Sequence, residues 1–303
     1  MNLIPNTDLK VFPVTLGTMT YGSPVAFDDA VRLTRYALSC GINLIDTANM
    51  YEGYNRFAGS SGGVAEEIVG EAVSTLDRGS VLIATKLGMK VGTAPEDEGT
   101  SAAAVHKQLS ASLKRMRTDY VDLYYLHRPD DTAPMEQTLA ALQEEMQAGR
   151  IRHYGVSNYS ADQLQALLNC ADRNHLPRPV VCQPPLSLLK QGALETLLPL
   201  CEKERIAVIP YQIYQGGLLT GKYHRGQKAP AGSRADEKPD WVMELTEELF
   251  DKLEGFAREA ESRQLTMTQY ALRWTLEQKA VVSAIVGVKN ERQIDDAVGA
   301  FHS

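Results

Sequence analysis

The sequence predicts an α/β protein in which eight parallel strands, each followed by a helix, close into a (β/α)8 TIM barrel. Short apolar runs without polar alternation recur along the chain, as expected of parallel strands buried on both faces. Amphipathic stretches of helical period separate these runs in one continuous rhythm, without a linker or repeat. Residues 1–303 are therefore expected to form a single domain. A doubly wound open sheet shows the same alternation and is the competing fold, but the strand count favours the barrel.

The strands and helices can be assigned in order from the apolar pattern. The predicted strands are Val14–Leu16, Asn43–Asp46, Val81–Lys86, Val121–His127, Ile151–Ser157, Val180–Gln183, Ile206–Tyr211 and Val282–Val286. The predicted helices are Phe27–Ser39, Val64–Leu76, Thr100–Met116, Met135–Ala148, Ala161–Arg173, Leu194–Glu204, Leu245–Arg263 with Met267–Leu276, and Glu291–Phe301. Each strand is followed by at least one helix, which is the repeating unit of the barrel.

Local signals mark several helix ends. Ser160, Thr266 and, with Asn as the cap, Asn290 each precede a predicted helix and have Gln three residues later, which is the spacing of a capping box. Gly41 and Gly149 follow predicted helices, where a residue in the left-handed conformation is expected. These signals support the assigned boundaries independently of the apolar pattern.

Two predicted loops between a strand and the following helix are unusually long. They cover Tyr51–Gly63 and Gln212–Glu244. In a barrel such loops lie at the carboxyl ends of the strands, where binding and catalysis are concentrated. We therefore expect both loops to contribute to a functional site.

Composition and charge exclude several classes of function. A formal net charge of −7 argues against a nucleic-acid partner, because such partners select basic surfaces. No apolar stretch is long enough to span a bilayer, and the first ten residues do not resemble a secretory signal. The four cysteines are scattered without metal-ligand spacing and are expected to be free thiols. We expect a cytoplasmic protein without a membrane partner, and the sequence leaves the oligomeric state open.

Polar residues close three of the early predicted strands. Asp46 ends NLID, Lys86 ends VLIATK and His127 ends DLYYLH, while Tyr51 lies in the loop just past Asp46. Each has an ordinary structural explanation by itself, such as helix capping or a buried structural histidine. In a barrel, however, the carboxyl ends of the strands share one rim. We therefore expect the four side chains to converge there.

The chemistry of these four residues is coherent. A buried Lys86 needs a counter-charge, which Asp46 can supply. An ammonium beside Tyr51 favours the phenolate, so it is expected to lower the pKa of this tyrosine. His127 can hold a substrate carbonyl by a hydrogen bond. The set does not resemble a zinc site, so no metal is expected. If the carbonyl is reduced, the hydride would have to come from an organic cofactor.

The segments LGTMTYG, GINLIDTANMY, ATKLG, DYVDLYYLHRPD, GRIRHYGVSN and GLLTGKY, in this order, resemble the aldo-keto reductase family over nearly the whole chain. The resemblance implies an NADP-dependent oxidoreductase of bacterial type that reduces aldehydes or ketones to alcohols by hydride transfer. It places Asp46, Tyr51, Lys86 and His127 in the family's catalytic tetrad, with Tyr51 as the general acid. The chain ends soon after its last predicted helix, so a short C-terminal tail is expected.

The resemblance also implies the residues that bind NADP(H), with NAD(H) less favoured. They are Gly17, Thr18, Asp46, Ser157, Asn158, Gln183, Tyr211, Gln212, Gly217, Leu219, Gly221, Lys222, Gly287, Lys289, Gln293 and Asp296. Among them Lys289, at the start of the last helix, is expected to hold the adenosine 2′-phosphate. The sequence departs from the family at Leu186, where an aromatic residue that stacks on the nicotinamide is common. It departs again at Ala297, where Asn near the adenine is common.

The substrate is expected to be a small-molecule carbonyl compound. The predicted substrate-binding residues are Tyr21, Tyr51, His127 and Arg128, with Tyr54, Phe57 and Trp241 in loops that could line the mouth. Two other functions stay open at this point. One is an NADPH-binding, redox-sensing regulatory subunit with little turnover. The other is a barrel lyase that uses Lys86 as a Schiff-base nucleophile, against which the neighbouring Asp46 argues because it would keep the lysine protonated.

Overall fold

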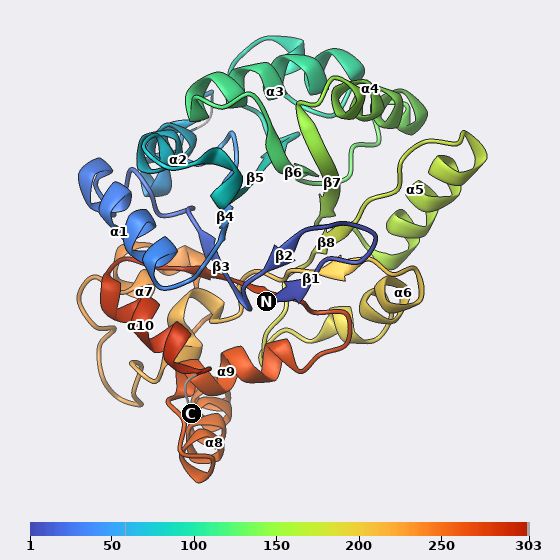
Figure 1. Ribbon diagram of the computed structural model, residues 1–303. Coiled ribbons are helices and arrows are strands. Elements are labelled where there is room, and N and C mark those ends of the chain that lie inside the picture. The colour runs from blue at the N-terminus through green and yellow to red at the C-terminus, as the bar shows by residue number, and fades with distance from the viewer. Residues whose placement is uncertain (58, 302–303) are drawn as a thin grey trace.

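The computed structural model, described here for residues 1–57 and 59–301, is a (β/α)8 barrel (Figure 1). Eight parallel strands lie side by side in the order β10, β3, β4, β5, β6, β7, β8 and β9. Their bounds are β3 Val14–Gly17, β4 Leu44–Asp46, β5 Leu82–Leu87, β6 Val121–Leu126, β7 Ile151–Ser157, β8 Val181–Gln183, β9 Ala207–Val208 and β10 Ala284–Gly287. All eight predicted strands are confirmed. The short C-terminal tail expected from the sequence includes residues 302–303, which lie outside the described residues.

Backbone hydrogen bonds close the sheet into a barrel. The amide of Val282 donates to the carbonyl of Val208 at 3.0 Å, and the amide of Ile285 donates to the carbonyl of Pro210 at 2.9 Å. These bonds join the β9 edge to the β10 edge, so the open-sheet alternative is wrong. β9 itself is shorter than predicted, because Pro210 has no amide hydrogen to donate to a ladder.

Helices surround the barrel (Figure 1). Their bounds are α1 Phe27–Ser39, α2 Val64–Val73, α3 Ala102–Met116, α4 Met135–Gln147, α5 Ala161–Arg173, α6 Leu197–Lys203, α7 Arg234–Glu237, α8 Glu247–Ser262, α9 Met267–Leu276 and α10 Glu291–Gly299. The capping boxes at Ser160 and Thr266 are confirmed, as is the left-handed conformation of Gly41 and Gly149. Asn290 caps α10 through its side chain, but the side chain of Gln293 accepts from the amide of Lys289 instead of completing a box.

A hairpin that the sequence analysis did not predict covers the amino-terminal end of the barrel. It consists of β1 Asn2–Leu3 and β2 Lys10–Val11, and crosses the barrel opening in the view of Figure 1. Ile4, Leu9 and Val11 pack there with inward-facing residues of several strands in one apolar cluster. Access to the barrel interior is therefore blocked at this end.

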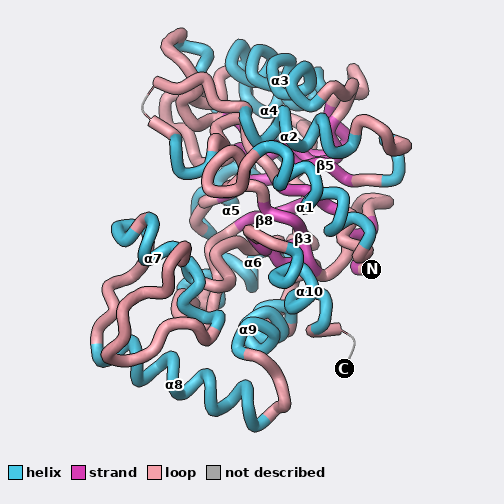
Figure 2. Tube along the Cα trace, turned by 90° about the vertical axis from the view of Figure 1, so that its left-hand side faces the viewer, coloured by secondary structure: helices cyan, strands magenta, loops and turns pink. Residues whose placement is uncertain are grey.

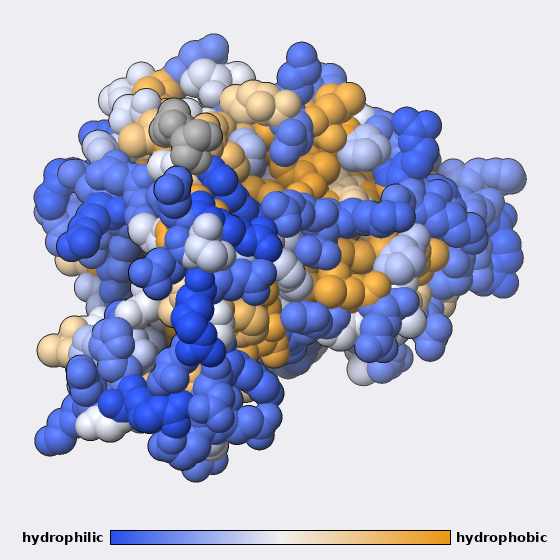
Figure 3. Space-filling model, turned by 90° about the horizontal axis from the view of Figure 1, so that it is seen from below, coloured by the Kyte–Doolittle hydropathy of each residue, from blue (hydrophilic) through white to orange (hydrophobic). Residues whose placement is uncertain are grey.

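The longest connection lies at the other end. Residues 212–244, which we call the strap, contain α7 and two short 3-10 segments, and lie opposite the N-terminus in Figure 2. The strap and α8 pack on a separate apolar cluster around Leu218, Tyr223 and Phe250. Seen from below, hydrophilic residues cover much of the surface, with apolar side chains in the hollows between them (Figure 3). No helix in the described part of the chain is long and apolar enough to cross a membrane.

Candidate active site

The alternation of side chains along the strands determines which residues face the barrel interior. Leu44 and Asp46 share one face of β4, and Leu123 and Tyr125 share one face of β6. Leu44, Leu123 and Tyr125 belong to the interior cluster, so Asp46 continues the same inward-facing row. Lys86 on β5 is paired with Tyr125 across the ladder and faces inward as well. Near the carboxyl ends of the strands, the inward positions thus change from apolar to polar.

Lys86 and Asp46 form a buried ion pair. Lys86 has no exposed surface, and its Nζ donates to Asp46 Oδ1 at 2.5 Å and to the carbonyl of Thr47 at 2.7 Å. Burial alone would lower the pKa of Lys86, but the carboxylate of Asp46 and then Tyr51 outweigh it, so the pKa is raised. The ammonium therefore keeps its proton. A Schiff-base nucleophile needs a neutral amine, so the lyase alternative is disfavoured.

Tyr51 lies next to this ion pair. Its hydroxyl is 3.4 Å from Lys86 Nζ, and the same ammonium lies 4.9 Å from the centre of its ring. Burial raises the pKa of Tyr51 above its usual value, while Lys86 lowers it and Asp46 raises it. The expectation of a lowered pKa is therefore wrong in its net direction, because the loss of hydration outweighs the nearby ammonium. Tyr51 is a protonated phenol in this structure.

His127 follows β6 and faces Tyr51. The two rings are 6.0 Å apart between centroids and nearly perpendicular. Burial, together with the positive charges of Lys86, Arg128 and Arg56, holds the pKa of His127 well below its usual value. The imidazole is therefore neutral at neutral pH. Its Nδ1 atom is buried without a hydrogen-bond partner among the described residues.

Side chains at the ends of β7 and β8 form a second polar group together with Tyr211, which lies just before the strap. Gln183 Nε2 donates to Asp46 Oδ2 at 2.7 Å, and Ser157 Oγ donates to the carbonyl of Gln183 at 2.9 Å. Asn158, whose φ of +62° is left-handed, accepts from the hydroxyl of Tyr211 at 2.6 Å and donates to the carbonyl of His127 at 2.9 Å. The structure thus connects four of the predicted cofactor residues to the Asp46–Lys86 pair.

Three cations, Lys222, Arg234 and Lys289, gather where the strap meets the turn before α10. Lys289 Nζ donates to the carbonyl of Gly232 at 2.8 Å and forms an ion pair with Glu237. Burial, followed by the charges of Lys289 and Arg234, lowers the pKa of Lys222. Gly217 has a φ of +97°, and a Cβ atom there would lie 2.7 Å from Lys222 Nζ. The strap therefore brings a glycine backbone and several positive charges together, which is the composition of an anion site.

Aromatic residues fasten the strap to the loop after β4. The rings of Tyr54 and Trp241 are 5.5 Å apart between centroids, in an edge-to-face arrangement. The guanidinium of Arg234 lies 5.2 Å from the Tyr54 ring, and Lys289 Nζ lies 5.4 Å from it. Such edge-to-face and cation–π contacts are favourable at these distances. The two long loops predicted from the sequence therefore meet at the rim.

The remaining predicted cofactor residues occupy the same rim. Gly17 ends β3, Gly287 ends β10, and the amide of Thr18 donates to the carbonyl of Asp46. Gln212 and Gly221 belong to the strap, and Gln293 and Asp296 lie on α10. Leu219 is fully buried and exposes no surface at the rim. Leu186 and Ala297 are both buried in the core beneath the helices. The two departures from the family pattern therefore lie under the surface of the rim.

A cavity of about 700 Å3 opens beside Tyr51. Its lining comes from the loop after β3, the two long loops and the loop after β5, and consists of Met19, Met50, Tyr51, Glu52, Gly53, Arg56, Phe57, Gly59, Lys90, Gly92, Thr93 and Trp241. Its size is within the usual range for small-molecule sites. Phe57 and Trp241 line it as expected, whereas Tyr54 packs behind Trp241.

Three predicted substrate residues lie outside this cavity: Tyr21, Arg128, and His127, whose ring faces Tyr51. Tyr21 is fully buried in the core, where its hydroxyl lies 2.9 Å from Thr34 Oγ1, so Met19 takes its expected place in the lining. Arg128 is partly exposed and forms an ion pair with Glu98 at 2.7 Å. The cavity instead contains Arg56, which the sequence analysis did not identify. Its position among the polar residues of a long loop gave no periodic signal.

The (β/α)8 barrel carries its buried polar group at the carboxyl rim, where barrels of this class place their active sites. A sequence model described as the aldo/keto reductase family matches residues 13–303, and the chain therefore belongs to this family. In the described part of the chain, no group of three or more His, Cys, Asp or Glu side chains could hold a metal ion. The family acts on small carbonyl compounds with a nicotinamide cofactor.

Three similar proteins illustrate the range of the family. The chain is 31% identical over 299 residues to "Probable voltage-gated potassium channel subunit beta" of Arabidopsis thaliana, covering 96% of this chain and 88% of the relative. It is 31% identical over 309 residues to L-glyceraldehyde 3-phosphate reductase of Escherichia coli O157:H7, covering 97% and 85%. Among solved structures, a glycerol dehydrogenase from Gluconobacter oxydans has a TM-score of 0.82 and 31% identity, covering 99% and 89%.

Proposed function

We propose that this protein reduces aldehydes or ketones to alcohols with NADPH, and that Tyr51 is the general acid. One observation carries the proposal: the Tyr51 hydroxyl is 3.4 Å from an ammonium that cannot lose its proton, and it borders the cavity. Burial raises the pKa of Tyr51, which keeps the phenol protonated and able to donate. A nearby fixed positive charge then stabilises the phenolate left after the transfer.

The four residues divide the work of the reaction. A nicotinamide held by the rim residues would supply the hydride that the carbonyl carbon accepts. Tyr51 transfers its proton to the carbonyl oxygen, and neutral His127 orients that oxygen by a hydrogen bond. Lys86 stabilises the resulting phenolate, and Asp46 keeps Lys86 charged. Tyr51 regains its proton from solvent after the alcohol leaves.

The rim residues fit a dinucleotide with a 2′-phosphate. Ser157, Asn158 and Gln183 offer side-chain donors and acceptors for the nicotinamide amide, and the half-buried ring of Tyr211 offers an aromatic face beside them. Gly217 and Lys222 suit the pyrophosphate. Lys289, before the α10 N-terminus, suits the 2′-phosphate, which supports NADPH over NADH.

Turnover of a panel of aldehydes, followed by loss of NADPH absorbance, tests this function. We expect reduction by the wild-type protein and a loss of at least about a hundredfold in kcat for Tyr51→Phe, in the range of general acid catalysis. NADPH binding, followed by fluorescence, should be retained in the variant, because the phenol is not among the groups proposed to hold the cofactor. Full turnover by Tyr51→Phe would exclude this tyrosine as the acid.

A second function is an NADPH-binding, redox-sensing regulatory subunit with little turnover. It is favoured by the relatives named as potassium channel beta subunits. The same experiment separates the two functions. Tight NADPH binding without reduction of any carbonyl compound would support the regulatory subunit, whereas turnover that depends on Tyr51 supports the reductase.

A further inference from the structure

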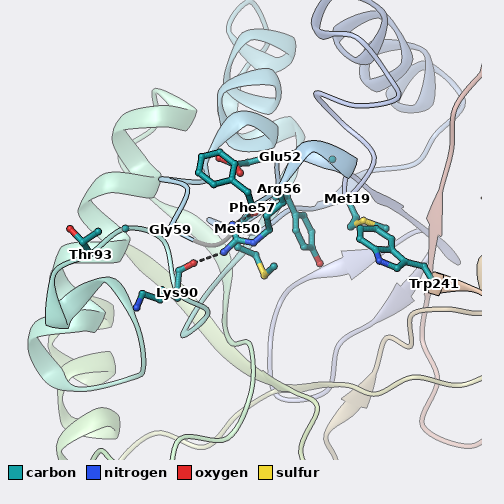
Figure 4. A pocket seen from close by; sticks show the side chains of 12 residues that line it. Met19, Met50, Glu52, Arg56, Phe57, Gly59, Lys90, Thr93 and Trp241 are labelled. Atoms are coloured by element: carbon teal, nitrogen blue, oxygen red, sulfur yellow. Dashed lines mark hydrogen bonds between the residues drawn. The ribbon is translucent and has the colours of Figure 1, made fainter. Parts of the chain in front are cut away.

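Arg56 is held rigidly at the wall of the cavity beside Tyr51. Its Nη1 donates to the carbonyl of Met50 at 2.8 Å and lies 3.4 Å from Ser60 Oγ, and its Nη2 donates to the carbonyl of Lys90. Figure 4 shows the guanidinium beside the backbone of Lys90, with Met19 and Trp241 across the cavity. Backbone carbonyls thus fix the side chain before any ligand arrives.

These bonds leave part of the guanidinium unused. Arginine has five N–H donors, and the three contacts do not involve Nε. Within the described residues Arg56 has no carboxylate partner, although Glu52 lines the same cavity. A guanidinium is always charged, and its planar fork matches a carboxylate or phosphate. The cavity wall therefore presents a fixed, uncompensated positive charge with free donors.

Arg56 differs in this respect from the other arginine near His127. Arg128 has a carboxylate partner in Glu98, does not line the cavity and is partly exposed. Both guanidinium groups are close enough to His127 to contribute to its lowered pKa. Arg56, unlike Arg128, lines the cavity together with Tyr51, and no carboxylate among the described residues pairs with it.

We propose that the substrate is a carbonyl compound that also carries an anionic group, a carboxylate or a phosphate, and that Arg56 binds this group. The inference rests on the proposed reductase function and adds the substrate class. The cavity of about 700 Å3 accommodates a small molecule with an apolar body between Phe57, Trp241 and Met19, with the anion at Arg56 and the carbonyl at Tyr51.

The test compares three aldehydes that share the benzaldehyde ring and differ in the para substituent: benzaldehyde, 4-carboxybenzaldehyde and 4-formylphenyl phosphate. For the wild-type protein we expect kcat/KM to be about tenfold or more higher for a charged aldehyde than for benzaldehyde, mainly through KM. The better of the two charged aldehydes distinguishes a carboxylate from a phosphate. In Arg56→Met the charged-to-neutral ratio should fall towards one, and Arg56→Lys should retain part of it. Arg128→Met is the matched comparison and should keep the ratio.

The outcomes separate this inference from the proposed function. Reduction of all three aldehydes at equal kcat/KM, or loss of the ratio in Arg128→Met but not in Arg56→Met, overturns the role of Arg56 and leaves the reductase intact. A second readout, calorimetric binding of 4-(hydroxymethyl)benzoate and benzyl alcohol to the NADP-loaded protein, does not need turnover. Tighter binding of the anionic alcohol that depends on Arg56 supports the anion site even if no aldehyde is reduced, and equal binding of the two alcohols contradicts it.

Discussion

Lys86 illustrates at the scale of one residue how burial and charge are balanced in this site. It is fully buried, and its charge depends on Asp46. We predict that Lys86→Met lowers kcat at least tenfold, which corresponds to about 1.4 kcal/mol of transition-state stabilisation. It should also lower the free energy of unfolding by about 3–5 kcal/mol, because Asp46 is left buried without its partner. Steady-state kinetics and urea unfolding measure the two effects.

The double variant Lys86→Met with Asp46→Asn is the control for this prediction. It removes both charges, so most of the lost stability should return while the rate stays low. A Lys86→Met protein with wild-type kcat would remove Lys86 from the mechanism. Recovery of kcat in the double variant would mean that Lys86→Met lowers kcat only because it leaves the Asp46 carboxylate buried without a partner.

His127 gives the protein a predictable dependence of stability on pH. Because its pKa is depressed in the folded state, the unfolded chain takes up a proton below a pH of about 6.5 that the folded chain does not. Stability should therefore decrease as the pH falls below this value. We predict that His127→Gln reduces the slope of unfolding free energy against pH between 5 and 6.5 by up to about 1.4 kcal/mol per pH unit. His153, whose pKa burial also lowers, should leave part of the slope in the variant.

At the scale of elements, the strap and the turn before α10 depend on each other through Lys289. This lysine bonds to Gly232 and Glu237 of the strap and is also the candidate partner of the 2′-phosphate. We predict that Lys289→Ala raises the Kd of NADPH more than that of NADH, by about tenfold for one lost charge-assisted contact. Fluorescence titration with both cofactors measures the difference.

Glu237→Gln separates the two roles of Lys289. It weakens the ion pair between the strap and the turn but leaves the lysine free to meet a phosphate. NADPH affinity should therefore be kept or increased in this variant. If Lys289→Ala weakens NADPH and NADH equally, the lysine only fastens the strap and does not recognise the 2′-phosphate.

The elements differed in how far the sequence could predict them. β6 was predictable because its mostly apolar run identifies a strand that is buried on both faces. The hairpin β1–β2 was not, since strands of two residues carry no periodicity. Positions outside regular strands were also uncertain: Tyr21 and Leu186 were expected at the rim, but their side chains are buried in the core. A sequence position near the rim does not determine which way a loop side chain points.

At the scale of the whole molecule, the two ends of the barrel have different tasks. The hairpin fills the amino-terminal end with apolar side chains, while the Asp46–Lys86 pair and the cavity occupy the carboxyl end. The convergence of the four rim residues was predictable, because parallel strands place their carboxyl ends together. Arg56 was not, because its role depends on three contacts made within loops.

This division predicts that stability and catalysis can be changed separately. Ile4 is fully buried beneath the barrel, whereas its neighbour Leu3 is 51% exposed on the same hairpin. We predict that Ile4→Ala lowers the free energy of unfolding in urea by about 2–4 kcal/mol, through lost burial and the cavity that is left. Leu3→Ala, the matched control, should change it by less than about 0.5 kcal/mol. Both variants should keep the kcat and KM of the wild type under conditions where they are folded, because neither residue is near the rim. A fall in kcat for folded Ile4→Ala would show that packing at the closed end also sets the geometry of the active end.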